Sequence, residues 1–133
     1  MGQLTLSDIY SPGFVGTVLV EAGTLQCDGK VLTNATVWLH AGATNTVGGS
    51  NPQMVSNLVL NGGTISAVTT GGRSLQGGVY VAQRSFLART AINSGPTLNI
   101  VLTGSSNLVL RTGSVPMLTV AGSGFNGSGY YGA

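Results

Sequence analysis

Short runs of alternating apolar and polar residues, separated by turn-forming residues, most constrain how this chain can fold. Residues 14–20 (FVGTVLV) follow Ser-Pro-Gly, residues 24–27 (TLQC) precede Asp-Gly, and residues 97–102 (TLNIVL) alternate throughout. A two-residue period is typical of a β-strand with one buried face. Roughly nine to eleven short strands, with turn signals about every 8–12 residues, predict an all-β domain.

The turn signals favour antiparallel pairing. Asp28-Gly29 and Asn61-Gly62 suit two-residue hairpin turns. The glycine pair at 77–78 indicates a bulge or a bend. Residues 41–52 are expected to be a loop because they contain Gly-Gly and Asn-Pro. We therefore expect a compact antiparallel β-sandwich of jelly-roll type, with a short β-helix as the alternative.

The pentapeptide SNLVL occurs twice, at 56–60 and 106–110. A β-helix with a coil of about 20–25 residues would repeat similar turns at that spacing. Residues 31–35 and 80–85 do not preserve the motif. The repeated pentapeptide is interpreted as two similarly built strands of one sandwich. Their leucines are expected to face one core: Leu58, Leu60, Leu108 and Leu110.

The chain is expected to form one domain, because its 133 residues match a common domain size. The β-domain covers 1–120, with a possible N-terminal arm at 1–13 and a Gly/Tyr-rich tail at 121–133. Residues 81–93 contain no Gly or Pro and could form a helix or a strand. Extended structure is favoured there because the flanking segments are extended.

Charged residues make up only 6% of the chain, against about 25% in typical proteins. With 42% hydrophobic residues, the chain is expected to be ordered. No apolar run is long enough for a membrane helix, and no basic segment precedes an apolar one as in a secretory signal. A surface this poor in charge is easier to understand if other subunits cover it, so we expect a homo-oligomer, a dimer or trimer.

The few charges are divided along the chain. All three acids lie within the first 28 residues, and the five cations follow: Asp8, Glu21 and Asp28, then Lys30, Arg73, Arg84, Arg89 and Arg111. The cations form no basic run, so a nucleic-acid partner is not expected. Complementary contacts between neighbouring subunits are favoured, because charge sets orientation in an interface.

Residues for catalysis or metal binding are scarce. His40 and Cys27 are the sole histidine and cysteine, and no GxSxG or phosphate-loop motif occurs. The acids are interpreted as turn or strand-end residues, too few for a carboxylate mechanism. Cys27 shares an alternation face with Leu25 and is expected to be a small buried residue. We expect a protein that is not an enzyme and has no cofactor or metal.

In composition the sequence resembles small virion proteins of tailed bacteriophages: a short all-β chain with almost no charge, rich in Gly, Thr, Ser and Asn, ending in Gly and Tyr. The resemblance includes no diagnostic motif. Head decoration (cement) proteins of such phages often have jelly-roll folds and clamp neighbouring capsomers. The resemblance implies a capsid decoration protein on the virion exterior, assembled in the host cytoplasm. Its implied partners are the major capsid protein or other virion subunits.

Partner contacts are expected from cations and aromatic side chains, since these dominate interfaces. The candidates are Arg84, Arg89, Phe125, Tyr130 and Tyr131. The alternative function is a receptor- or glycan-binding tip of a fibre or adhesin. That function needs exposed aromatic side chains, and Trp38 and Tyr80 are its candidates.

Overall fold

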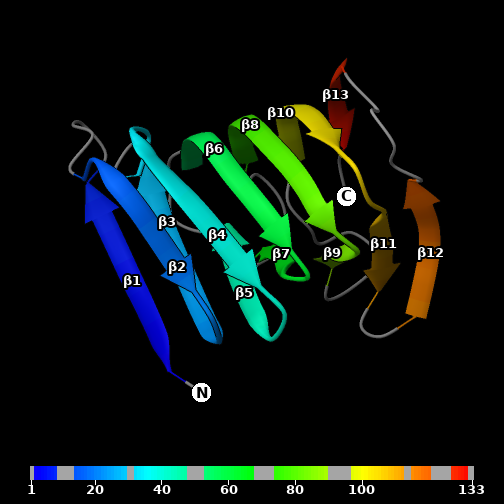
Figure 1. Ribbon diagram of the computed structural model, residues 1–133, viewed down its shortest axis with the longest axis horizontal. Coiled ribbons are helices and arrows are strands. Elements are labelled where there is room, and N and C mark those ends of the chain that lie inside the picture. Colours follow the sequence, from blue (N-terminus) through cyan, green and yellow to red (C-terminus); the bar gives the residue numbers. More distant parts are fainter. Residues whose placement is uncertain are drawn as a thin grey trace.

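The protein, in a computed structural model, is built from strands (Figure 1). The structure describes residues 2–8, 14–29, 32–47, 53–67, 74–89, 97–112, 115–120 and 127–131. The strands are β1 (Gln3–Asp8), β2 (Gly16–Val20), β3 (Gly23–Gly29), β4 (Ala35–His40), β5 (Ala43–Val47), β6 (Gln53–Asn61), β7 (Thr64–Ala67), β8 (Ser74–Gln83), β9 (Ser85–Arg89), β10 (Thr97–Gly104), β11 (Leu108–Thr112), β12 (Val115–Val120) and β13 (Gly127–Tyr131). No helix among the described residues is long and apolar enough to cross a membrane.

The strands form two sheets, and the chain passes from one to the other after almost every strand. The seven-stranded sheet has the order β1-β3-β5-β7-β9-β11-β12, and the six-stranded sheet has the order β13-β10-β8-β6-β4-β2. The pairs from β1 to β11 and from β2 to β10 are parallel. At the C-terminal end, β12 pairs antiparallel with β11, and β13 pairs antiparallel with β10. Each strand therefore lies beside the next-but-one strand, which is the arrangement of a β-solenoid (Figure 1).

The prediction of an antiparallel jelly-roll sandwich is wrong, and the alternative, a short β-helix, fits. A single alternating strand looks the same in either fold, because the pattern reports only that one face is buried. What separates the folds is the partner of each strand. In this chain the partner lies about one coil away in sequence and not across a tight turn.

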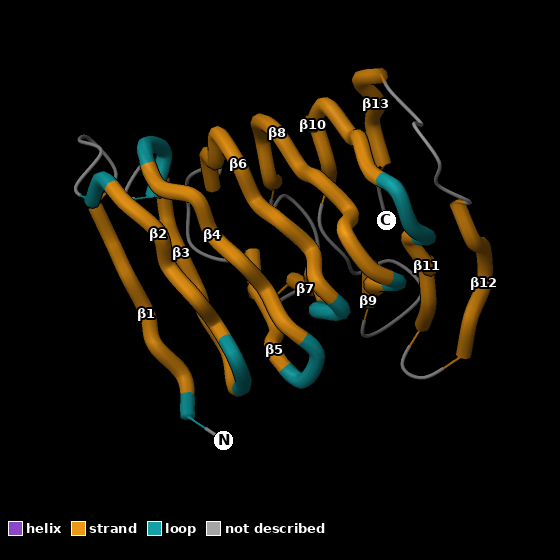
Figure 2. Tube along the Cα trace, viewed as in Figure 1, coloured by secondary structure: helices purple, strands orange, loops and turns teal. Residues whose placement is uncertain are grey.

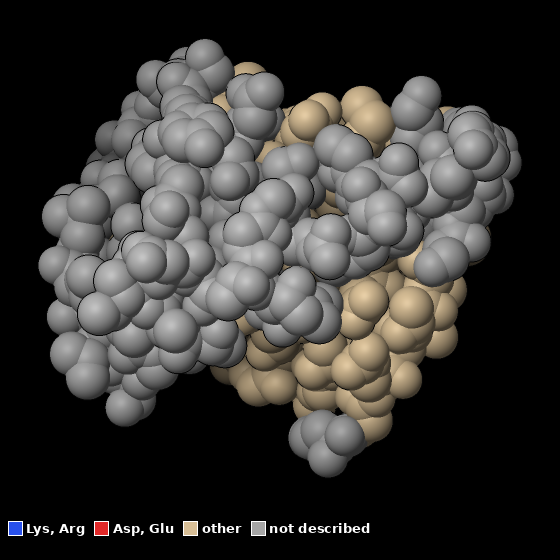
Figure 3. Space-filling view, turned by 180° about the vertical axis from the view of Figure 1, so that it is seen from behind, with Lys and Arg blue, Asp and Glu red and all other residues tan. Residues whose placement is uncertain are grey.

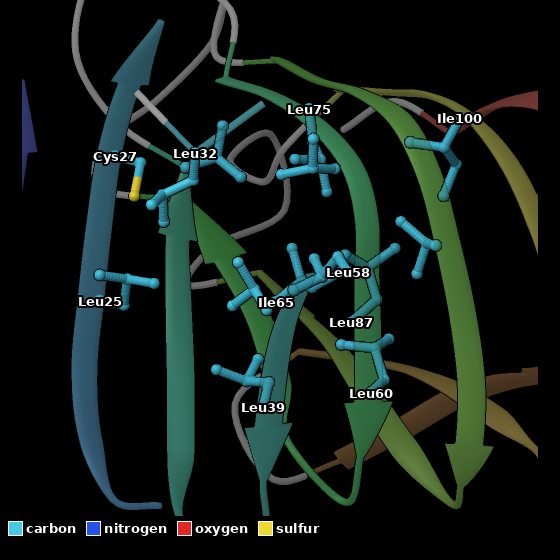
Figure 4. Close-up of a cluster of buried hydrophobic side chains, with 14 of the residues drawn as sticks. Leu25, Cys27, Leu32, Leu39, Leu58, Leu60, Ile65, Leu75, Leu87 and Ile100 are labelled. Carbon is cyan, nitrogen blue, oxygen red and sulfur yellow. The ribbon is translucent and has the colours of Figure 1, made fainter. Parts of the chain in front are cut away.

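The interior repeats although the sequence motif does not. In one inward column Val18 pairs with Val37, Val37 with Leu58, Leu58 with Val79 and Val79 with Leu102, at steps of 19, 21, 21 and 23 residues. Every member is Val or Leu, and the four from Val37 onward are buried. Leucines and valines from both sheets pack together in one core (Figure 4). Burying each such side chain contributes about 1.5–3 kcal/mol.

The two predicted hairpin turns are corners between the sheets. Gly29 ends β3 with φ 73°, and Gly62 follows β6 with φ 93°. In each case the next strand belongs to the other sheet. Figure 2 shows such corners as short loops joining the front and rear layers. The hairpin prediction failed because a glycine at positive φ permits either kind of turn.

The predicted loop at 41–52 contains a strand. β5 has Ala43, Asn45 and Val47 buried, with its two threonines facing outward. Thr and Val favour strands, but a buried Asn breaks the apolar alternation and hides the pattern. The Asn45 amide forms two hydrogen bonds of 3.0 Å with that of Gln53 in β6, which is also buried. This reciprocal pair satisfies both polar groups inside the core.

The two SNLVL copies are not equivalent strands of a sandwich. The first lies within β6 in the six-stranded sheet, and the last three residues of the second begin β11 in the seven-stranded sheet. They do not stack as neighbouring coils either. Leu58, Leu60 and Leu108 are buried in one core as expected, and the side chain of Leu110 lies outside the described part.

Several local predictions are confirmed. Residues 81–89 are extended in β8 and β9, whereas 90–93 lie outside the described residues. In β4 the apolar residues face inward and Trp38 and His40 face outward. Cys27 is buried near Leu25, and burial raises the pKa of its thiol to about 12.

The glycine pair in β8 accompanies an irregular register, as expected. Val55 pairs with Gly77, but Leu58 pairs with Val79, so β6 holds one extra residue at this point. Gly77 has φ 119°, and a Cβ there would overlap the carbonyl oxygen of Val55. Only glycine allows the two backbones to approach this closely.

Candidate binding face

The outer face of the six-stranded sheet carries a column of apolar and aromatic side chains. Leu19 pairs with Trp38, Trp38 with Val59, and Val59 with Tyr80. These residues alternate with the inward positions of their strands, so their side chains lie on the outside. We call Leu19, Trp38, Val59 and Tyr80 the outer column.

Exposure varies along the outer column. Leu19 is 59% exposed and Tyr80 is 40% exposed, while Trp38 is half-buried. Val59 is only 5% exposed, although it is not part of the interior cluster. Its neighbours on the two adjacent strands are Trp38 and Tyr80. The apolar surface of the outer column is therefore presented by Leu19, Trp38 and Tyr80.

Polar side chains flank the outer column. The His40 ring stacks on Trp38, with centroids 6.2 Å apart and planes 20° from parallel. The Asn61 amide nitrogen lies 3.1 Å from His40 Nδ1, so the amide donates and Nδ1 accepts. At the other end of the column, the Tyr80 hydroxyl donates to Ser105 Oγ at 3.4 Å. These contacts hold the Trp38 and Tyr80 rings beside hydrogen-bonding groups.

The spacing of the aromatic rings follows from the fold. Neighbouring strands lie about 4.8 Å apart, so Trp38 and Tyr80, two strands apart, are separated by roughly 10 Å along the sheet. Parallel pairing on a rigid sheet fixes this distance without any loop. The face can therefore contact an extended ligand at two points.

The sequence analysis predicted Trp38 and Tyr80 as separate candidates and did not predict that they share one column. Val59 joins them at steps of 21 residues in each direction. That step is the signal that could have revealed the column, but it has meaning only once the coil length is known.

The expected partner-contact residues are dispersed. Arg84 is exposed between β8 and β9, with its guanidinium carbon 5.2 Å from the centre of the Phe86 ring. Phe86 is half-buried on the outer side of β9, because Leu87 takes the inward position. Arg89 ends β9.

The aromatic residues of the tail lie at the far end of the molecule. Tyr130 and Tyr131 belong to β13, where they pair with Asn99 and Leu98 of β10. Phe125 lies outside the described residues. β13 pairs with β10, and not with β8 or β9, between which Arg84 lies.

No group of three or more His, Cys, Asp or Glu residues that could hold a metal occurs within the described ranges. His40 contacts Trp38 and Asn61. Within the described residues, no carboxylate contact to His40 is seen. No protein-family model matches the sequence, and no curated protein or solved structure shows significant similarity to it.

Proposed function

We propose that the protein is a non-enzymatic binding module of the fibre or adhesin type, and that the outer column holds a glycan chain. The outer column is the observation that carries this proposal. Solenoids stack repeated units into extended lateral surfaces, and such surfaces commonly serve binding. The rigid parallel sheet provides that surface here.

The chemistry of the face suits a sugar. A pyranose ring has C–H groups on its faces and hydroxyl groups around its rim. Trp38 and Tyr80 offer aromatic carbon for the ring faces, and Asn61, His40 and Ser105 offer donors and acceptors for the rim. The separation of the two aromatic rings favours an oligosaccharide over a single sugar.

A glycan array followed by calorimetry with the best ligand tests the proposal. We expect Trp38→Ala and Tyr80→Ala each to weaken binding about tenfold, because lost stacking of about 1–2 kcal/mol corresponds to such a change. The matched control is Phe14→Ala, which removes an aromatic residue of similar exposure, 45%, away from the outer column. Absence of any glycan ligand, or a double variant that binds as the wild type does, contradicts the proposal.

Capsid decoration is a second candidate, favoured by the outer face of the seven-stranded sheet. This face is lined by half-buried uncharged side chains, including Thr24, Thr44, Thr46 and Thr64. Figure 3 gives the view from behind, in which the described residues on show are neither Lys, Arg, Asp nor Glu, but the side chains of six of the eight charged residues lie outside the described part. Such a surface could be covered by capsid subunits. Immunogold imaging of the native particle separates the two candidates: copies spread over a shell support decoration, and copies at a tip or on filaments support adhesion.

A further inference from the structure

The two ends of the solenoid differ in how the sheets stop. At the C-terminal end, β12 follows β11 and β13 follows β10, so the two sheets end level with each other. At the N-terminal end, the seven-stranded sheet begins with β1, one coil beyond β3, whereas the six-stranded sheet begins with β2. β1 therefore projects by one strand, and no described strand lies opposite it (Figure 1).

The place opposite β1 is an apolar groove beside the edge of β2. Its volume is about 670 Å³, and its walls include Leu4, Val18 and Val20. Leu4 is 56% exposed, and Val18 and Val20 are only half-buried. Their partners on β4, Val37 and Leu39, are buried. The core is therefore incomplete at this end, by the width of one strand.

We propose that this groove binds β1 of a second copy of the chain, and that β1 of the first copy fills the same groove of the second. A two-fold axis parallel to the strands relates the copies, so the same surface is used on both, as is usual in dimers. One projecting strand fills one vacant place, and each sheet continues into the other sheet of the partner. The C-terminal end of another copy does not fit, because its two sheets end level.

The directions of the strands allow this contact. β1 and β2 run in opposite directions (Figure 1). A rotation about an axis parallel to the strands leaves their directions unchanged, so β1 of the partner lies antiparallel to β2. Antiparallel pairs are slightly more stable per residue than the parallel pairs that build the rest of the solenoid. Strand addition to an open edge is a common mode of association.

Backbone hydrogen bonds between coils follow one rule in both sheets. In the seven-stranded sheet, the outward residue Thr24 donates its N–H to the carbonyl oxygen of Gly2 in the preceding coil, at 3.0 Å. At the end of β10 in the six-stranded sheet, the outward residue Ser105 donates in the same way to Val81, also at 3.0 Å. Outward residues therefore direct their backbone groups toward the preceding coil.

This rule gives the register of the new pair. β1 and β2 begin their sheets, so their outward residues, Thr5 and Leu19, direct backbone groups at the open edges. β2 ends at Val20, just before β3 begins, and Leu4 lies beside the start of β3, so Leu4 and Val20 are at similar heights along the axis. Thr5 therefore pairs with the partner's Leu19, and both point their backbone groups at each other.

The same register completes the core. Leu4 and Leu6 are the inward residues of β1, since they pair with the buried Leu25 and Cys27 of β3. In the dimer they lie beside the inward valines of the partner's β2 and face the partner's β1 across the interior. The apolar residues that now line the groove thereby become part of one core that runs through both copies.

The expected interface is small but rich in hydrogen bonds. Two antiparallel pairs of five to six residues form roughly ten hydrogen bonds, a number found in ordinary interfaces. At about 30–40 Å² per interface residue, β1, β2 and the corner after β2 bury roughly 800–900 Å² over both copies, which is typical of weak complexes. We therefore expect a Kd on the order of micromolar.

Sedimentation equilibrium over a concentration series tests the dimer. The wild type is expected to change from monomer to dimer, because the two-fold contact closes on itself. Leu4→Lys places a charge in the groove and is expected to raise the dimer Kd at least about tenfold. Val101→Lys is the matched control, since Val101 is 49% exposed on β10, away from the groove.

Thr5→Pro tests the backbone bonds at the open edge of β1. The Thr5 N–H points away from β3, so proline at this position removes no bond within the chain, and edge strands accept it. The variant is expected to keep the circular dichroism spectrum of the wild type and to raise the dimer Kd at least about tenfold.

Cross-linking with a short bismaleimide tests the pairing of β1 with β2. A copy with Thr5→Cys and a copy with Leu19→Cys are mixed, and a covalent dimer is expected only in the mixture, because directly opposed residues are close. Replacing the second copy by one with Thr24→Cys is expected to remove the product, because the two-fold axis places that residue on the opposite face. Cys27 does not compete, because it is buried and its pKa, raised to about 12, keeps the thiol protonated at neutral pH.

Three results would overturn the proposal. One is a wild type that stays monomeric at millimolar concentration. Another is a folded Thr5→Pro variant that dimerises as the wild type does. The third is cross-linking of Thr5→Cys to Thr24→Cys copies as efficiently as to Leu19→Cys copies, which would show a different arrangement of the two chains.

Discussion

The two sheets have similar interiors and different exteriors. Both bury mainly Val, Leu and Ile in the shared core. Outside, the six-stranded sheet carries Trp38, Val59 and Tyr80, whereas the seven-stranded sheet carries threonines in the corresponding central strands. The parallel pairs of the seven-stranded sheet keep a constant register, while β6 and β8 shift. A fold fixed by its interior thus leaves each outer face free to specialise.

The largest effect at neutral pH is expected from the irregular backbone of the six-stranded sheet. Gly77→Ala should lower the free energy of unfolding by roughly 3 kcal/mol or more, because the new Cβ overlaps the Val55 carbonyl and φ is positive. Gly42→Ala is the control: its φ is 90°, but the nearest atom to its Cβ, the Glu21 carbonyl oxygen, is 4.0 Å away. Urea unfolding of both variants separates the effect of the Cβ overlap from that of positive φ. Equal losses of unfolding free energy would contradict a close approach between Gly77 and the Val55 carbonyl.

Alkaline pH should weaken the inner side of the seven-stranded sheet through Cys27. Its pKa is raised from 9.0 to about 12 by burial, so above pH 9 the unfolded chain loses a proton that the folded chain keeps. Stability is full below pH 9 and falls by about 1.4 kcal/mol per unit between pH 9 and 12. Unfolding of Cys27→Ala over the same range should show a shallower decline. Parallel curves for the two proteins would count against a buried thiol.

The amide pair that joins the two sheets gives the next effect. Asn45→Ala leaves Gln53 without this partner in the core and should cost about 1–3 kcal/mol. Replacing both residues by Leu should recover much of that loss, because no polar group then remains at the site. A double-mutant cycle by urea unfolding measures the coupling. Additive single effects would mean that the amides do not interact.

The smallest effects should come from the two outer faces, and they should differ. Trp38→Ala removes the cross-strand neighbour of Val59 and should cost about 1 kcal/mol, in the range of cross-strand aromatic pairs. Thr44→Ala on the opposite face should stay within about 0.5 kcal/mol. Thermal unfolding of both variants checks this difference. Equal values would mean that the outer column adds nothing to stability.

Local patterns in the sequence predicted the strands better than their pairing. The inward and outward sides of β4 and the burial of Cys27 follow from alternation alone. The pairing of Val37 with Leu58 does not, because any buried strand of suitable length could occupy that place. β5 was missed since its central inward residue is Asn45, whose partner Gln53 is known only from the fold.

The site could be predicted only in part for the same reason. Trp38 and Tyr80 stand out as aromatic residues in a chain that has few. Their alignment through Val59 depends on the coil length. No local motif encodes that length.

The steps of about 21 residues between stacked strands have a consequence for how such a protein can change in length. Duplication of one step would insert a complete pair of strands, add about 4.8 Å to each sheet, and leave every other contact between neighbouring strands intact. An insertion of one residue within a strand would instead turn the later inward residues of that strand outward. Adding one pair of strands at a time therefore lengthens the outer face of the six-stranded sheet by one strand spacing and keeps its interior contacts.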